Sequence, residues 1–96
     1  MGTHRDPASK RASRLAHLSD AERALIARVG GRITALRDRA GRMTIAELAR
    51  QAGLHPSYVG EVERGQANAS LTSLCRIAAA LDVSVSDIVA ESALPP

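Results

Sequence analysis

The sequence predicts an all-α domain with five core helices, and three observations lead to this fold class. Positions 19, 44 and 84 carry Ser or Thr followed three residues later by an acidic residue, which is the spacing of a capping box. Apolar residues behind these positions recur at helical intervals, and no window alternates convincingly with a period of two. The 96 residues include one Tyr, no Phe and no Trp. The core must therefore consist of Ala, Leu, Ile and Val, which suit closely packed helices.

The first helix is expected to begin at Ser19, whose partner in the capping box is Glu22. Gly41 marks its end. Gly30 and Gly31 interrupt the apolar pattern, so we expect either a break or two consecutive helices at this point. The apolar positions of this segment are Leu25, Ile26, Val29, Ile33, Leu36 and Ala40.

Two short helices are predicted next, over residues 45–52 and 56–64. Thr44 and Glu47 form the capping box of the first, and Gly53 closes it. Pro56 suits the first position of the second. Two short helices joined by a turn of about three or four residues with a Gly have the layout of a helix-turn-helix, although many other helical hairpins share it.

The second short helix has two different faces. Val59 and Val62 lie three residues apart and can face inward. An opposite polar face is free to enter a groove of DNA. This polar face consists of Ser57, Gly60, Glu61 and Arg64.

Two further helices complete the predicted domain. Ser70 is the expected cap of one, and Ser84 with Asp87 forms the capping box of the other. Their apolar positions are Leu71, Leu74, Ile77, Ala78 and Leu81 in the first and Val85, Ile88 and Val89 in the second.

Basic residues are concentrated in the front half of the chain. Residues 1–18 and residues 19–50 each carry a net charge of +3, whereas residues 51–96 carry −3, which gives the total of +3. Thirteen Lys and Arg residues include a single Lys. This distribution favours a phosphate-bearing partner such as nucleic acid, and a solvated basic surface is the alternative.

The composition excludes several other functions. Cys75 is the lone cysteine, so no internal disulfide is possible, which fits a reducing cytoplasm. His4, His17, His55 and Cys75 lie on different elements without metal-ligand spacing, and we expect no metal and no cofactor. No apolar run reaches the length of ~18 residues that suggests a membrane span, and no signal peptide is recognisable. Without a catalytic cluster the chain is not expected to be an enzyme or to bind a small molecule.

Five sequence pieces together resemble a known family. They are LR at 36–37, AELA at 46–49, AGL at 52–54, YVGEVERG at 58–65 and SL, L, IA and L within 70–81. The chain is similar here to the Cro and phage-repressor (XRE-like) helix-turn-helix family, in particular to controller proteins of restriction–modification systems and small stand-alone bacterial repressors. The resemblance covers about two-thirds of the chain.

The resemblance implies a five-helix, lambda-repressor-like DNA-binding domain that dimerises and recognises a palindromic operator. It also implies an internal ion pair, which falls on Arg37 and Glu63. We assign residues 19–94 to this domain, with the helix-turn-helix at 44–65 and a flexible basic arm or extra helical segment at 1–18. We expect a cytoplasmic, nucleoid-associated bacterial protein.

The expected DNA contacts form two groups. Base edges are expected to meet Ser57, Tyr58, Gly60 and Glu61, since a Glu can accept a hydrogen bond from the amino group of cytosine. For Tyr58, packing between the two short helices is an equal alternative. Phosphates are expected at helix N-termini and basic side chains, at Thr44, Arg64, Asn68 and Ser70.

The dimer surface is expected on an apolar stripe of the fifth helix, Val85, Val89 and Leu94, with the segment 20–29 as a competitor. The basic arm either follows phosphates or a minor groove, or has no role. Its cations are Arg5, Lys10, Arg11 and Arg14.

The function expected from these features is a transcriptional repressor or autoregulator that binds double-stranded DNA as a homodimer. One alternative is an antitoxin that represses its own operon while holding a toxin. Another alternative is a protein-interaction module that has lost DNA binding. Departures from the family pattern at Ile45, Pro56 and Glu61 support this alternative.

Overall fold

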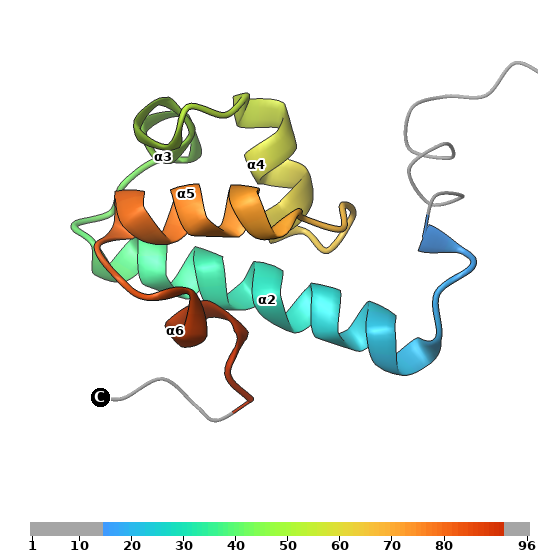
Figure 1. Ribbon diagram of the computed structural model, residues 1–96. Helices are drawn as coiled ribbons and strands as arrows, with labels where there is room; N and C mark the ends of the chain where they lie inside the picture. The colour runs from blue at the N-terminus through green and yellow to red at the C-terminus, as the bar shows by residue number, and fades with distance from the viewer. Residues whose placement is uncertain (1–14, 92–96) are drawn as a thin grey trace, which may run out of the picture.

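The structure is a computed structural model that describes residues 15–91. Helix α2, Asp20–Arg39, forms the base, and the shorter helices pack around it (Figure 1). These are α3, Ile45–Ala52; α4, Pro56–Glu63; α5, Leu71–Leu81; and α6, Val85–Val89. The predicted all-α architecture with five core helices is confirmed, and no strand occurs within residues 15–91.

The helices begin where the sequence predicts. Ser19, Thr44 and Ser84 each form a complete capping box, in which the side chain of the cap accepts a hydrogen bond from the third helical residue and that residue's carboxylate accepts one in return. Ser70 caps α5 by accepting from the backbone N–H of Ser73. Local hydrogen bonding therefore explains the start of four of the five helices.

One expectation about α2 is wrong. Gly30 and Gly31 do not break the helix, which runs without interruption from Asp20 to Arg39. Gly30 is buried where the end of α4 crosses α2: a Cβ atom built on it would lie 2.3 Å from the carbonyl oxygen of Val62 and 2.6 Å from that of Glu63. The glycine thus permits a close backbone approach, and tertiary packing maintains the helix despite the low helical propensity.

A single apolar core lies between the helices. Packing joins α2 to α4 and α6, α3 to α4 and α5, and α5 to α6. The fully buried side chains come from all five helices and are aliphatic, as the composition predicts. The largest of them are Ile33, Leu48, Ile77, Ile88, Val59 and Val62.

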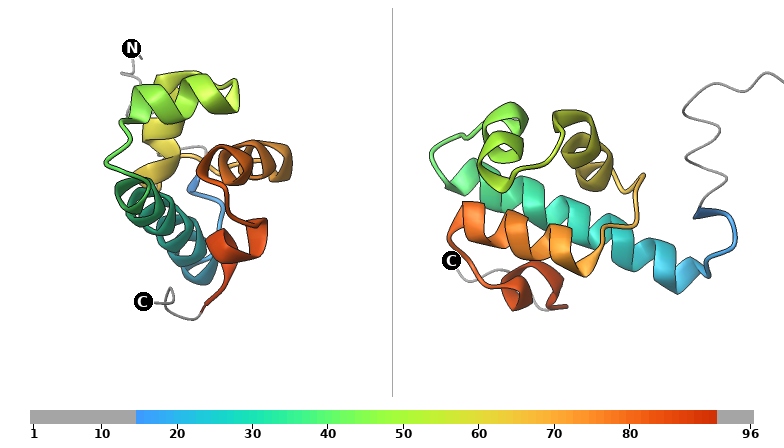
Figure 2. Two further views of the ribbon diagram at one scale, coloured as in Figure 1. Left: turned by 90° about the vertical axis from the view of Figure 1, so that its left-hand side faces the viewer. Right: turned by 45° about the horizontal axis from the view of Figure 1, so that its top comes forward.

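The two short helices and α6 occupy different sides of the molecule. Figure 2 shows α3 and α4 together beyond one flank of α2, while α6 lies against the other. Within residues 15–91, no helix combines the length and the apolar character that a membrane span requires. The same residues contain no group of three or more His, Cys, Asp or Glu arranged to hold a metal ion.

Candidate nucleic-acid interface

Helices α3 and α4 have the geometry of a helix-turn-helix. The first ends at Gly53, which adopts a left-handed conformation with φ of 70° and reverses the chain direction. Leu54 and His55 follow, and Pro56 stands at the first position of α4. Since the pyrrolidine ring fixes φ near its helical value, the N-terminus of α4 is preformed.

The inward face of α4 is apolar and the outward face is polar. Val59 and Val62 have exposed fractions of 0% and 1%. Ser57 and Arg64 are exposed and Glu61 is half-buried. A polar stripe of α4 is therefore accessible from solvent along the length of the helix.

Gly60 differs from the expectation that it belongs to the accessible polar face. It is buried in the structure, because the guanidinium of Arg64 lies over it. A Cβ atom built on Gly60 would be 3.0 Å from Nη1 of Arg64. The accessible stripe in this structure thus consists of Ser57, Glu61 and Arg64, with Gly60 beneath the Arg64 side chain.

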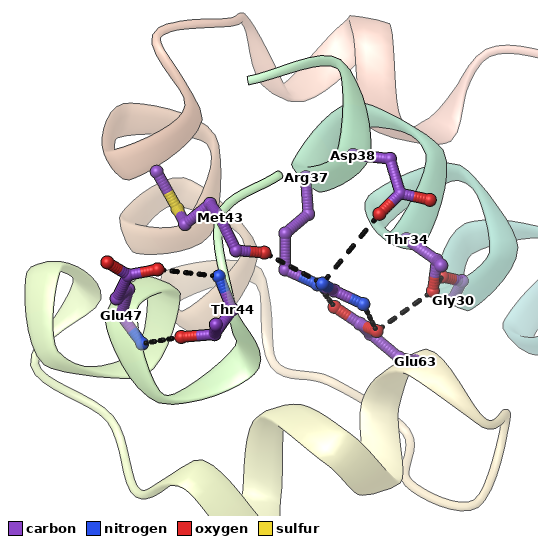
Figure 3. A network of polar contacts seen from close by, with 8 residues as sticks. All are labelled: Gly30, Thr34, Arg37, Asp38, Met43, Thr44, Glu47 and Glu63. Carbon is purple, nitrogen blue, oxygen red and sulfur yellow. Dashed lines mark hydrogen bonds and ion pairs between the residues drawn. The ribbon is translucent and has the colours of Figure 1, made fainter. Parts of the chain in front are cut away.

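Glu63, the last residue of α4, forms an ion pair with Arg37 of α2 (Figure 3). Arg37 Nε donates to Glu63 Oε2 at 2.8 Å, and Arg37 Nη2 donates to Glu63 Oε1 at 2.9 Å. The exposed fractions of the two side chains are 15% for Arg37 and 5% for Glu63. Hydrogen bonding to Glu63 raises the pKa of Arg37. This arrangement is the bidentate geometry in which guanidinium and carboxylate bind most strongly.

Two further contacts extend this pair. Arg37 Nη1 donates to the carbonyl oxygen of Met43 at 2.8 Å, immediately before the N-cap of α3. The hydroxyl of Thr34 lies 2.9 Å from Glu63 Oε1 and 3.1 Å from the carbonyl oxygen of Gly30. Arg37 therefore holds the beginning of α3 and the end of α4 at once, so one side chain of α2 relates the two helices.

Tyr58 makes a contact that the sequence did not reveal. Its hydroxyl donates to Ser73 Oγ at 3.2 Å, and the side chain is half-buried. Ser73 is itself 2.9 Å from the hydroxyl of Ser70, the N-cap of α5. The Tyr58 hydroxyl thus connects α4 to the first turn of α5, and the half-buried Tyr58 side chain lines a hollow together with Glu61.

The four residues that are expected to contact phosphates are all exposed, and they lie before or after α4 in the sequence. Thr44 caps α3, Ser70 caps α5, and Arg64 and Asn68 lie between α4 and α5. Each capping hydroxyl accepts a backbone N–H hydrogen bond within its own helix. The first turns of α3 and α5 also direct backbone N–H groups outward, which makes both sites attractive to anions.

The two segments predicted as alternative dimer surfaces, the last helix and residues 20–29, line the same groove. Leu25 is 41% exposed and Val89 is 36% exposed, and both line an apolar groove of about 140 Å³ between α2, α6 and the loop after α4. Val85 is partly buried against the core. Leu94 and the cations at positions 5, 10, 11 and 14 lie outside the described residues.

Comparison with known proteins agrees with this geometry. A model of the family described as Helix-turn-helix (HTH_3) matches residues 33–88. The immunity repressor protein of Bacillus phage phi105 is 42% identical over 66 residues. That match covers 69% of this chain but 45% of the phage protein, so the chain spans less than half the length of this curated relative.

Two solved structures show similar folds at substantial identity. The restriction-modification controller protein C.AhdI from Aeromonas hydrophila is 40% identical with a TM-score of 0.64, over 68% of this chain and 97% of the controller. The master regulator for biofilm formation SinR from Bacillus subtilis, solved in complex with DNA, is 40% identical with a TM-score of 0.56, over 59% of this chain and 90% of the SinR chain in that structure.

Proposed function

This chain belongs to the helix-turn-helix family, and from that premise we propose that it is a sequence-specific DNA-binding transcriptional regulator. It acts as a repressor or autoregulator, binds a palindromic operator as a homodimer, and performs no catalysis. The observation that carries the proposal is the accessible polar stripe of α4, held in a fixed orientation by the buried Arg37–Glu63 pair. The site of action is the bacterial nucleoid in the cytoplasm.

In the proposed complex, α4 enters the major groove of DNA. Ser57 and Glu61 meet base edges, and the Glu61 carboxylate accepts a hydrogen bond from a cytosine amino group. The half-buried Tyr58 side chain contacts a thymine methyl group while its hydroxyl stays hydrogen-bonded to Ser73. When the exposed Arg64 side chain turns to a phosphate, it uncovers Gly60, where a base edge can approach the backbone closely.

The proposed phosphate contacts lie on both sides of α4. Thr44 and the first turn of α3 hold one phosphate, and Ser70 with the first turn of α5 holds another. Arg64 and Asn68, both exposed, add contacts between them. Because Glu61 carries a negative charge on the reading face, these phosphate contacts supply most of the affinity and Glu61 supplies selectivity.

The proposed dimer uses the groove between α2 and α6. Within residues 15–91 the exposed large apolar side chains are Leu25, Leu71 and Val89, and two of these three line that groove. In an isologous dimer each subunit would place its own Leu25 and Val89 against the groove of the other, with Val85 and Leu94 beside them. Figure 2 shows α6 and α4 on different sides of α2, so a dimer built on α6 leaves both reading helices free.

The relatives are consistent with this function. One is an immunity repressor, one is a restriction-modification controller, and SinR has been solved with DNA. An antitoxin would use the same domain but hold a toxin as a second partner. A protein-interaction module would keep the fold and bind no DNA.

Selection of duplexes from a random DNA pool tests the proposal, followed by binding of the selected duplex across a salt series. We expect an enriched palindrome with half-sites spaced about one helical turn (~10 bp) or a multiple of it, and an affinity that falls steeply with salt. Salt-sensitive binding without enrichment would contradict sequence specificity. Absence of binding at low salt, together with a co-purifying protein, would instead support the interaction module.

A further inference from the structure

Helix α6 is too short to be stable by itself. It has five residues, and a helix of this length depends on contacts with the rest of the protein. The capping box of Ser84 and Asp87 closes its first turn, and Ile88 is buried in the core with an exposed fraction of 1%. These contacts fix the beginning and the inner side of α6. The carbonyl groups at its end require donors from outside the helix.

Arg32 of α2 is such a donor. Its Nη1 donates to the carbonyl oxygen of Asp87 at 2.9 Å, and its Nη2 donates to the carbonyl oxygen of Ala90 at 3.1 Å. A guanidinium presents its N–H groups in a rigid planar arrangement, so two acceptors that it binds at once have a defined separation. Positive charge is also favourable at the C-terminal end of a helix. Arg32 therefore fixes the course of the backbone from residue 87 to residue 90.

Val89 lies in the sequence between the two carbonyl groups that Arg32 binds. Its side chain is 36% exposed and lines the apolar groove, to which α2 contributes Leu25 with an exposed fraction of 41%. Because Arg32 and Leu25 belong to the same helix, the two hydrogen bonds of Arg32 also place Val89 relative to Leu25. The spacing of the two exposed apolar groups of the groove thus depends on one guanidinium.

The chemistry of the groove favours a second copy of this chain as its occupant. Among residues 15–91, the side chains that line the groove include no ionisable group. In an isologous contact each subunit presents the same surface, so a charged groove would bring like charges together. An uncharged apolar groove packs against its own copy without this repulsion.

We propose that Arg32 is a positioning residue for dimerisation: by binding the carbonyl groups of Asp87 and Ala90, it keeps Val89 in the groove where a second copy of the chain packs. Arg32 acts through α6 and contacts neither the second copy nor DNA. The proposal rests on the dimer of the proposed function. It adds a determinant of operator affinity that lies outside α3 and α4.

Sedimentation of the full-length chain over a range of protein concentrations tests the proposal. We expect Arg32→Gln to raise the dissociation constant of the dimer about tenfold, the order expected for lost hydrogen bonds from a charged donor. Thermal melting checks that this variant is folded, which is expected because Arg32 lies outside the apolar core.

Arg28→Gln is the matched control. Arg28 lies one turn before Arg32 on the same side of α2, so the substitution removes the same charge from nearly the same place. Within residues 15–91 no hydrogen bond joins Arg28 to α6, and the buried Nε of Arg28 has no hydrogen-bond partner. Arg28→Gln should leave the dissociation constant of the dimer within about twofold of the wild-type value.

DNA binding and hydrogen exchange distinguish a positioning role from a defect in the whole fold. Arg32→Gln should weaken binding to the selected palindrome about three- to tenfold, because fewer dimers form. It should leave binding to a duplex with a single half-site within about twofold, because α3 and α4 lie on the other side of α2 from α6 (Figure 1). Backbone amides of α6 should exchange faster in this variant, while those of α4 keep their protection.

The outcomes separate this proposal from the proposed function. An unchanged dimer in Arg32→Gln, or an equal weakening in Arg28→Gln, would overturn the positioning role. Equal losses on the palindrome and on the half-site would overturn it too, because Arg32 would then act on the whole fold. A wild-type chain that stays monomeric would instead remove the proposed dimer, and the role of Arg32 with it. If the wild-type chain dimerises but selects no duplex, DNA reading fails, while sedimentation and hydrogen exchange still decide the role of Arg32.

Discussion

Arg37 of α2 and Glu63 at the end of α4 are joined by two hydrogen bonds of 2.8 and 2.9 Å, and both side chains are largely removed from solvent. The third contact of Arg37, to the carbonyl oxygen of Met43, extends the same side chain to the start of α3. The orientation of both helices of the helix-turn-helix thus depends on one guanidinium.

Removing Glu63 should be costly. Glu63→Ala leaves the guanidinium of Arg37 without its principal partner, and we expect a loss of about 3 kcal/mol in the free energy of unfolding, measured by urea denaturation. Asp38→Ala is the control: Asp38 is 3.9 Å from the same arginine but 68% exposed. It should cost less than about 0.5 kcal/mol. Equal losses for the two variants would contradict the importance of the buried pair.

Substitution of Ala for the two neighbouring glycines of α2 should have opposite effects on the stability of the domain. Gly30→Ala places a methyl group against the carbonyl oxygens of Val62 and Glu63 and should destabilise the domain by about 2 kcal/mol or more. Gly31 has no atom within 4 Å of a built Cβ, so Gly31→Ala should stabilise the helix by roughly 0.5–1 kcal/mol. Thermal melting of both variants measures the difference. A harmless Gly30→Ala would show that α4 crosses α2 differently.

The capping box of α3 should contribute to the pH dependence of stability. The Glu47 carboxylate accepts a hydrogen bond from the backbone N–H of Thr44, and this is the main reason why the pKa of Glu47 lies below its ordinary value of 4.5. Hydrogen bonding with the Thr44 side chain lowers the pKa of Glu47 further. The ionised form is thus favoured by folding, and its contribution is present above pH 4.5 and lost as the pH falls through the lower pKa of the folded state.

Glu47→Gln retains an acceptor oxygen but cannot ionise. The difference in unfolding free energy between wild type and this variant should be constant near neutral pH and shrink as the pH falls below about 4.5. Urea denaturation at several pH values measures it. A difference that grows on acidification would have the wrong sign for this capping box.

The groove beside Val89 should hold the dimer together. Val89→Asp and Leu25→Asp each place a charge in the apolar groove and should yield monomers in sedimentation experiments, since burial of an unpaired carboxylate is unfavourable. Leu71→Asp is the matched control, because Leu71 is 70% exposed and does not line the groove. Dimers that survive both groove substitutions would place the interface elsewhere.

Sequence reasoning succeeded where the determinants are local. The capping boxes at Ser19, Thr44 and Ser84 depend on residues three positions apart, and the structure contains all three. The inward face of α4 was likewise evident from the spacing of Val59 and Val62, both of which are buried.

Features that depend on tertiary packing were missed or misread. The low helical propensity of Gly30 predicts a helix break. The structure instead shows a continuous helix in which this glycine makes room for the backbone of α4. Gly60 is covered by the side chain of Arg64, which spacing alone does not reveal. The hydrogen bonds of Tyr58 to Ser73 and of Arg23 to the turn before α2 have no sequence signature, because they depend on how the elements are placed in space.

The most direct test of DNA reading by α4 is a comparison of the sequences that wild-type protein and Glu61→Gln select from a random duplex pool. Asp82→Asn is the control, since it removes one negative charge at the end of α5 and suits the left-handed conformation there. Glu61→Gln should change the preferred base pair at one position of each half-site, while the control should select the wild-type sequence. An identical motif for all three proteins would contradict base recognition by Glu61 and would place the reading surface elsewhere.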